Sequence, residues 1–174
     1  MEIRETTIAD LPAALALNNS SIPALNELDA PEIERLLGMA ALALTAEVDD
    51  VFAGFCITFP PGVDYASLNY AWFSRNYDGF IYLDRIAVDP AFRRYGIGRA
   101  FYDRIVERFT GVYPQLLCEV NVRPRNEASL LFHHSIGFRE VGQQDTDGGN
   151  KTVSLLALPL HPSSRPTDQQ YHPE

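Results

Sequence analysis

Arginines and glycines gather in the segment VDPAFRRYGIGRAF, residues 88–101. It follows a strand-like run, GFIYLDRIAV, and leads into an amphipathic helix whose apolar residues recur at four-residue spacing, at Ile97, Phe101, Ile105 and Phe109. Glycines in such a turn let the backbone approach a ligand closely and expose consecutive N–H groups. The start of a helix adds unpaired donors and a partial positive charge. The segment therefore predicts a binding site for an anion such as a phosphate or pyrophosphate.

The charge distribution agrees with a site for a small anion. The chain has a net charge of −9, which argues against general nucleic-acid binding, yet residues 85–139 carry nine arginines against five acidic residues. Arginines scattered over the surface by chance are the alternative. The pattern of a nucleotide P-loop is absent, and Phe101 occupies the third glycine position of the dinucleotide pattern GxGxxG.

A second segment, NEASLLFHHSIGF, residues 126–138, places two histidines side by side in an apolar run. Neighbouring residues of a helix point about 100° apart, so the two side chains cannot share one environment. The apolar residues around Phe132 put His133 on the flank of the buried face and His134 toward solvent.

The pattern of apolar residues and turn signals predicts one α/β domain of the α+β type, residues 1–160. Hairpins mixed with strand–helix–strand connections favour a mixed sheet with helices on both faces. Asp29 and Glu32 form a capping-box pair before a helix, and Asp49–Asp50 form a tight turn between two strands. Residues 60–79 are expected to be irregular, and the polar, proline-rich residues 161–174 are expected to be a disordered tail. The expected strands are 1–6, 41–48, 51–59, 79–88, 115–122, 138–144 and 151–160, and the expected helices are 11–19, 32–40, 96–109 and 127–136.

The sequence has no uninterrupted apolar run long enough to cross a membrane, and the N-terminus MEIRETTIAD lacks the pattern of a signal peptide. We therefore expect a cytoplasmic protein with no membrane contact. Cys56 and Cys118 lie in apolar strand-like runs without metal-ligand spacing, so we expect two buried free thiols rather than a disulfide or a catalytic thiol. No metal site is expected.

Together, the two segments resemble the GNAT superfamily of N-acetyltransferases, in particular a bacterial branch of uncharacterised predicted acetyltransferases. The resemblance covers about residues 1–160 in element order as well as in motif. In the first segment, RRYGIG fits the family pattern [RQ]-x-x-G-x-G. The second segment fits the family pattern N-x-x-[AS]-x-x-x-[YH]-x-x-x-G-F at Asn126, Ser129, His133, Gly137 and Phe138.

This resemblance implies a central sheet of about seven strands, mostly antiparallel, that is splayed between the strands at 80–88 and 116–122. It also implies acetyl-coenzyme A as co-substrate, with the acetyl group moved directly to a primary amine of a small molecule or peptide. The residues implied to contact coenzyme A are Ile86, Ala87 and Val88 on the strand, Arg93, Arg94, Tyr95, Gly96, Ile97, Gly98 and Arg99 in the loop, and Asn126, Ser129 and His133 on the last helix.

Three residues are candidates for the proton transfers. Glu119 is a carboxylate in a mostly apolar strand near the expected opening, suited to a general base, although a salt bridge to Arg123 or Arg85 is the alternative. Asp84 is a second candidate base, and strand alternation puts it on the face of Tyr82 and Ile86. His133 stands where many relatives carry Tyr, so we expect it to position the thioester sulfur and assist proton movement, unless it only fills space.

Six of the nineteen aromatic residues lie within residues 60–80. A long aromatic segment before the cofactor strand suggests an acceptor pocket or lid; a small aromatic core or a dimer contact is an equal alternative. The candidate acceptor-binding residues are Tyr70, Trp72, Phe73 and Tyr77.

Two rival functions remain open at this stage: a coenzyme A-binding sensor or interaction module without catalysis, and an unrelated nucleotide-binding enzyme. We expect a monomer or homodimer that binds no nucleic acid.

Overall fold

The computed structural model describes residues 1–161, so nearly all of the predicted tail, residues 161–174, lies outside the described residues. The strands are β1 (Glu2–Glu5), β2 (Leu42–Val48), β3 (Val51–Phe59), β4 (Ile81–Val88), β5 (Gln115–Arg123), β6 (Arg139–Thr146) and β7 (Lys151–Pro159). The helices are α1 (Leu11–Ser20), α2 (Ala30–Met39), α3 (Leu68–Asn76), α4 (Ile97–Phe109) and α5 (Glu127–Ser135). Short 3₁₀ turns occupy Ile8–Asp10, Pro90–Phe92 and Asp147–Gly149.

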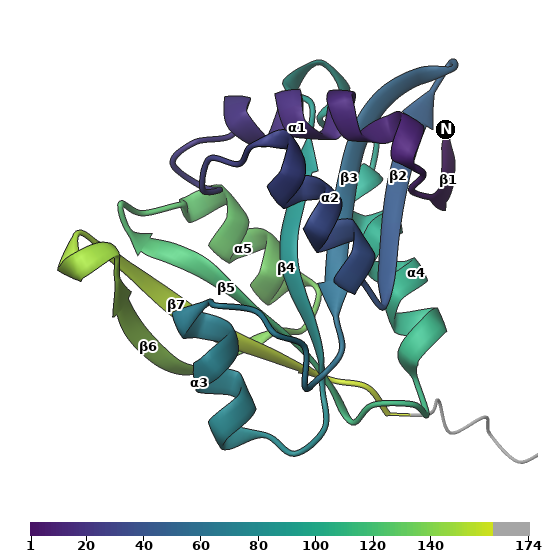
Figure 1. The fold of residues 1–174 in the computed structure, drawn as a ribbon. Coiled ribbons are helices and arrows are strands. Elements are labelled where there is room, and N and C mark those ends of the chain that lie inside the picture. The colour runs from purple at the N-terminus through teal and green to yellow at the C-terminus, as the bar shows by residue number, and fades with distance from the viewer. Residues whose placement is uncertain (162–174) are drawn as a thin grey trace, which may run out of the picture.

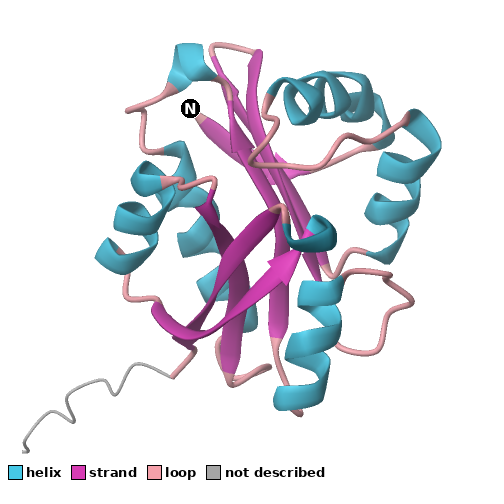
Figure 2. Cartoon of the chain, turned by 90° about the vertical axis from the view of Figure 1, so that its left-hand side faces the viewer, coloured by secondary structure: helices cyan, strands magenta, loops and turns pink. Residues whose placement is uncertain are grey.

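The strands form one seven-stranded sheet in the order β1-β2-β3-β4-β5-β7-β6 (Figure 1). The β4–β5 pair is parallel, and every other neighbouring pair in the described sheet is antiparallel. Figure 2 shows helices on both sides of the strands. The predicted fold class, a mixed and mostly antiparallel sheet with helices on both faces, is confirmed.

Each face of the sheet has its own hydrophobic core. Helices α4 and α5 cover one face, where Phe101 and Leu130 pack with Leu116 of β5. Helices α1, α2 and α3 cover the other face, where Phe73 packs with Leu117 of the same strand. No described helix has both the length and the apolar character needed to cross a bilayer.

Local signals predicted the ends of several elements correctly. The Asp29 side chain accepts a hydrogen bond from the Glu32 N–H at 2.9 Å, and the Glu32 carboxylate accepts one from the Asp29 N–H, which completes the capping box of α2. Asp49 and Asp50 both have positive φ, at 51° and 63°, as a two-residue hairpin turn requires.

The expectation of an irregular segment over residues 60–79 was wrong, because α3 lies within it. The Ser67 side chain accepts a hydrogen bond from the Tyr70 N–H at 3.3 Å and caps the helix. Tyr70 and Phe73, three residues apart, then share its buried face. This helix is stabilised by the contact of its aromatic rings with the sheet rather than by intrinsic helix propensity.

Candidate active site

The loop before α4 presents backbone N–H groups outward from the helix. Arg94 and Gly96 both have positive φ, 76° and 78°, which turns the chain sharply just before Ile97 begins the helix. The N–H of Ala100 donates to the Gly96 carbonyl at 2.9 Å and closes the first helical turn. The N–H groups of residues 97–99 precede that bond, and so they point out of the helix end, where an anion can accept their hydrogen bonds.

Several side chains of this loop lie in solvent. Those of Arg93, Arg94 and Tyr95 are exposed. Arg99 pairs with Asp103 one turn later, with 3.0 Å between Nε and Oδ1. The loop can therefore supply both backbone donors and positive charge to a phosphate group.

Strands β4 and β5 separate after a short contact. They pair at only two positions in the described sheet, Ile81 with Leu116 and Tyr82 with Leu117, and then diverge (Figure 1). The rest of β4, through Ile86, Ala87 and Val88, continues to pair with β3 on its other edge. The edge of β4 that faces β5 is therefore open to an extended ligand, which can bind there as an added strand would.

A register shift in β4 changes which side chains face the opening. Ile57 of β3 opposes Arg85, but the next residue, Thr58, opposes Leu83, so Asp84 is an extra residue in β4. Ile86 consequently packs in the core under α4, whereas Tyr82 packs in the core of the opposite face. The expectation from strict alternation, that Tyr82, Asp84 and Ile86 share one face, was wrong because this bulge interrupts the alternation.

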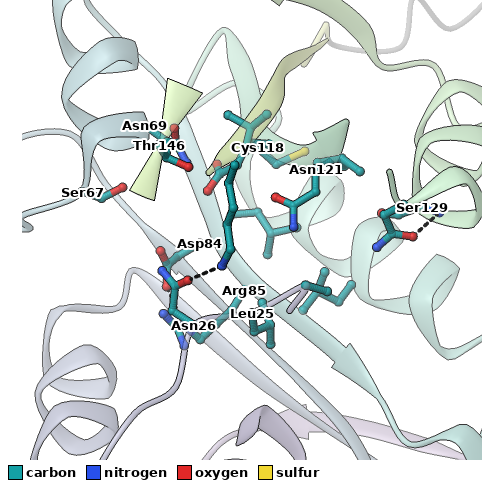
Figure 3. A pocket seen from close by; sticks show the side chains of 18 of the residues that line it. Leu25, Asn26, Ser67, Asn69, Asp84, Arg85, Cys118, Asn121, Ser129 and Thr146 are labelled. Carbon is teal, nitrogen blue, oxygen red and sulfur yellow. Dashed lines mark hydrogen bonds and ion pairs between the residues drawn. The ribbon is translucent and has the colours of Figure 1, made fainter. Parts of the chain in front are cut away.

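A cavity of about 170 Å³ occupies the space between the separated strands. Its lining includes Tyr102, Cys118 and His133 from the α4–α5 side and Tyr65, Asp84 and Glu119 from the α3 side. Figure 3 shows Asp84 and Asn69 on one side of this space and Ser129 on the other. The cavity therefore passes through the sheet and joins its two faces.

Glu119 has one free carboxylate oxygen in this cavity. Oε1 accepts a hydrogen bond from the Tyr82 hydroxyl at 2.9 Å, whereas Oε2 is buried and has no hydrogen-bond partner among the described residues. Burial raises the pKa of Glu119 to about 8, and the negative charge of Asp84 adds to the rise, while the Tyr82 hydrogen bond, the nearby Asn69 side chain and the positive charge of Arg85 offset part of it. A carboxyl group with this pKa is mostly protonated at pH 7, and its ionised form, whose share grows as the pH rises toward 8, can accept a proton through the free oxygen.

The two alternatives weighed for Glu119, salt bridges to Arg123 and Arg85, are not formed. Arg123 pairs instead with Asp145 at the exposed end of the strand, and Arg85 pairs with Asp84. Glu119 is thus held by a neutral phenol, which leaves its carboxylate without a neutralising cation in direct contact.

Asp84, in contrast, has partners on both oxygens. Oδ1 accepts from the Tyr65 hydroxyl at 2.5 Å, and Oδ2 accepts from Arg85 Nε at 2.6 Å. Arg85 also donates from Nη1 to Asn18 Oδ1 of α1 at 2.7 Å. This buried network ties α1 to β4, so Asp84 is less suited than Glu119 to accept a substrate proton.

His133 is buried and both of its ring nitrogens have partners. Nδ1 lies 2.6 Å from the Ser129 carbonyl oxygen, which can only accept, so Nδ1 carries the hydrogen. Nε2 is then the acceptor for the Tyr102 hydroxyl, 2.5 Å away. Burial lowers the pKa of His133, which keeps the ring neutral at pH 7. His133 therefore orients the Tyr102 hydroxyl in this structure, and its contact with a thioester stays a prediction.

The N-terminus of α5 brings the other residues of the second motif to the cavity. Asn126 caps the helix, because its Oδ1 accepts a hydrogen bond from the Ser129 N–H at 3.2 Å. Asn126 and Ser129 both line the cavity together with His133. His134, as the helical spacing predicted, is exposed.

The four predicted acceptor-binding aromatics do not line the cavity. Tyr70 and Phe73 are buried in the core under α3, Tyr77 packs against that core, and the ring of Trp72 packs over Gly142 of β6. The alternative of a small aromatic core describes this segment better. The residues of the segment that do reach the cavity are Tyr65, Ser67 and Asn69.

Sequence reasoning missed Tyr102 and Lys151, which line the cavity, and Tyr82, which holds Glu119 in place from the core. Tyr102 lies one position away from the apolar stripe of α4, and nothing local marks it as the partner of His133.

Cys56 and Cys118 are buried free thiols, as predicted. Burial raises the pKa of the Cys118 thiol well above its ordinary value, so this cysteine is not suited to act as a nucleophile.

Comparison with known proteins gives consistent matches. The model of the acetyltransferase (GNAT) family matches residues 14–138. The ribosomal protein bS18-alanine N-acetyltransferase of Escherichia coli K12 is 32% identical over 84 residues, which cover 45% of this chain and 55% of that protein. The chain thus spans about half the length of the curated relatives it matches.

Solved structures match over nearly the whole chain. The E. coli ribosomal-protein-S18-alanine N-acetyltransferase has a TM-score of 0.71 at 22% identity, covering 95% of this chain and 97% of that one. The Salmonella typhimurium protein yncA, whose structure includes its cofactor acetyl-CoA, has a TM-score of 0.67 at 20% identity, covering 100% and 98%. At these identities the likeness concerns the fold.

Proposed function

This chain belongs to the acetyltransferase (GNAT) family, and we propose that it moves an acetyl group directly from acetyl-coenzyme A to a primary amine, with Glu119 as the general base. The observation that carries the proposal is the free Oε2 of Glu119, buried in a cavity where two parallel strands separate. The acceptor class rests on the relative that is named an alanine N-acetyltransferase.

The residues present fit coenzyme A. The pyrophosphate would accept hydrogen bonds from the N–H groups of residues 94–99, with Arg93, Arg94 and Arg99 adding positive charge. The pantetheine arm would lie along the open edge of β4 at Ile86, Ala87 and Val88. Gly96 has a φ of 78° and no atom within 4 Å of the position a Cβ would take, so the loop leaves open space in front of the helix.

When bound, acetyl-coenzyme A supplies the acetyl group as an activated thioester. The chain itself must remove a proton from the attacking amine, because a protonated amine has no lone pair. Glu119 can do so through Oε2, while Tyr82 fixes the orientation of the carboxylate through Oε1. The Tyr102 hydroxyl also lines the cavity, and because its proton is donated to His133 Nε2, its oxygen can only accept a hydrogen bond there, such as one from the thiol of released coenzyme A.

Thiol release from acetyl-coenzyme A tests the proposal, measured with a panel of free amino acids, short peptides and small amines and corrected for hydrolysis. We expect acetylation of at least one amine class. Glu119→Gln keeps the shape and the Tyr82 contact but cannot accept a proton, so it should lower kcat by about 10²- to 10⁴-fold. Its dissociation constant for coenzyme A, measured by calorimetry, should change little.

Two results would contradict this assignment. If Glu119→Gln retained full turnover, Glu119 would not be the base. If coenzyme A bound tightly but no amine in the panel released thiol, the rival function of a coenzyme A-binding module without catalysis would be favoured. Arg75→Met, on the exposed surface of α3, is a suitable control with unchanged turnover.

A further inference from the structure

Lys151 is the only lysine of the chain, and it lines the cavity that holds Glu119. It begins β7 and pairs in register with Thr146 of β6, which lines the same cavity. Its Nζ donates to Asn26 Oδ1 of the α1–α2 connection at 3.2 Å. Figure 3 shows Asn26 and Thr146 on the cavity wall.

The ammonium group of Lys151 has no acidic partner among the described residues. Each ion pair within residues 1–161 joins an arginine to a carboxylate, and the contact of Lys151 with Asn26 is to a neutral amide. The other cation of the lining, Arg85, is neutralised by Asp84. Lys151 is thus a cavity cation whose charge is not balanced, in a protein of net charge −9. An anion is the ligand that would balance it.

The cavity is therefore divided by charge. The carboxyl group of Glu119 offers a hydrogen-bond and proton acceptor for an amine at one place, since the charge of Asp84 is neutralised by Arg85, and Lys151 offers a positive charge at another. Glu119 of β5 pairs with Leu155 of β7, and Lys151 lies four residues before Leu155 on that strand. Four residues of a strand span about 13 Å, at about 3.3 Å per residue. An extended peptide covers that distance in about four residues, and in fewer when the side chains of Glu119 and Lys151 lean toward each other.

We propose that Lys151 binds an anionic group of the acceptor, so that the preferred acceptor is a short peptide, or a peptide end, with a carboxylate about three residues from its free amine. This proposal rests on the proposed acetyltransferase function, because it assigns the amine to Glu119. Lys151 then acts as a specificity-determining residue: it holds the far end of the acceptor and takes no part in proton transfer.

Trialanine and trialanine amide make a matched pair of probes, because they share the amine and differ by one negative charge. With acetyl-coenzyme A saturating, the wild-type protein should have a KM about two- to fivefold lower for trialanine than for its amide, as an ion pair accessible to solvent predicts. Lys151→Met should abolish this difference by raising the KM for trialanine alone. Lys151→Arg should preserve most of it, and Arg75→Met, which removes one exposed positive charge, should not change it.

A Lys151→Met variant that raised both KM values equally would overturn the proposal, since it would show that Lys151 only ties β7 to the α1–α2 connection. Equal KM values in the wild-type protein would overturn it as well. Calorimetric binding of N-acetyl-trialanine and its amide to the coenzyme A-loaded protein measures the same preference without turnover. If the protein bound the carboxylate form selectively but released no thiol with any amine in the turnover assay, the acetyltransferase function would be contradicted and the anion site would stand. If it bound both forms equally, the anion site would be overturned.

Discussion

Replacing Glu119 by glutamine should make the protein more stable at alkaline pH. The pKa of Glu119 is about 8 in the folded protein against an ordinary value of 4.5. Since the folded state holds this proton more tightly than the unfolded state, the stability that the protonated group contributes is full below pH 4.5 and is lost as pH rises toward 8. The glutamine side chain of Glu119→Gln does not titrate, so the variant should escape this loss.

The size of the effect follows from the shift in pKa. Between 4.5 and 8, each pH unit costs the wild-type protein about 1.4 kcal/mol at this residue. Over the two units from pH 6 to pH 8, the free energy of unfolding of Glu119→Gln should therefore rise by about 2–3 kcal/mol relative to wild type. Other titrating groups are common to both proteins and cancel in the difference.

Urea unfolding at pH 6, 7 and 8 and constant ionic strength measures this difference directly. Glu34→Gln, which removes one carboxylate at an exposed position of α2, is the matched control. The reasoning would be refuted if the Glu119→Gln and wild-type stabilities ran parallel across this range. The kcat/KM of the wild-type enzyme should rise with pH, reach half its maximum near pH 8 and level off above it if the same group is the base.

Three further substitutions test, one at a time, the cofactor loop, the Tyr102–His133 hydrogen bond and the Arg4–Asp10 ion pair. Gly96→Ala should weaken coenzyme A binding several-fold in calorimetry, because a φ of 78° costs a residue with a Cβ about 1 kcal/mol, and an unchanged affinity would contradict the role of the loop. Tyr102→Phe leaves His133 Nε2 without its hydrogen-bond donor and should lower the free energy of unfolding by about 1–3 kcal/mol. In a His133→Phe background the same substitution should cost much less, and additive losses would disprove the coupling between Tyr102 and His133. Arg4 lowers the pKa of Asp10 to about 2, so Asp10→Asn should lower the free energy of unfolding by about 2 kcal/mol at pH 7. Denaturant unfolding at a series of acidic pH values should show this difference from wild type disappearing as the pH falls from 4 to 2.

The local features of the fold could be predicted because nearby residues determine them. The capping box at Asp29 and Glu32, the hairpin turn at Asp49–Asp50 and the opposite environments of His133 and His134 each depend on residues within one or two turns of each other. Helix α3 could have been found from its Ser67 cap, but its aromatic residues have weak helix propensity.

The contacts that organise the cavity could not be predicted in this way. Tyr82 and Glu119 are 37 positions apart, and Tyr102 and His133 are 31 apart, so each pair depends on how strands and helices pack. The bulge at Asp84 likewise arises from the pairing of β4 with β3, which a strand's own alternation does not encode. Lys151 and Asn26, 125 positions apart, meet only because β7 inserts between β5 and β6 in the sheet.

The two residue pairs that join β4 to β5 also have a mechanical consequence. Strands β1–β4 and strands β5–β7 form two half-sheets, and helix α4 bridges them, since Phe101 and Ile105 pack in one core with Leu44 of the first half and Leu116 of the second. The angle between the halves is therefore set by the volume of core side chains that do not line the cavity. In the proposed function, affinity for coenzyme A would in this sense be a property of core packing, and a change of one methylene under α4 would alter the width of the slot between the two strands from a distance.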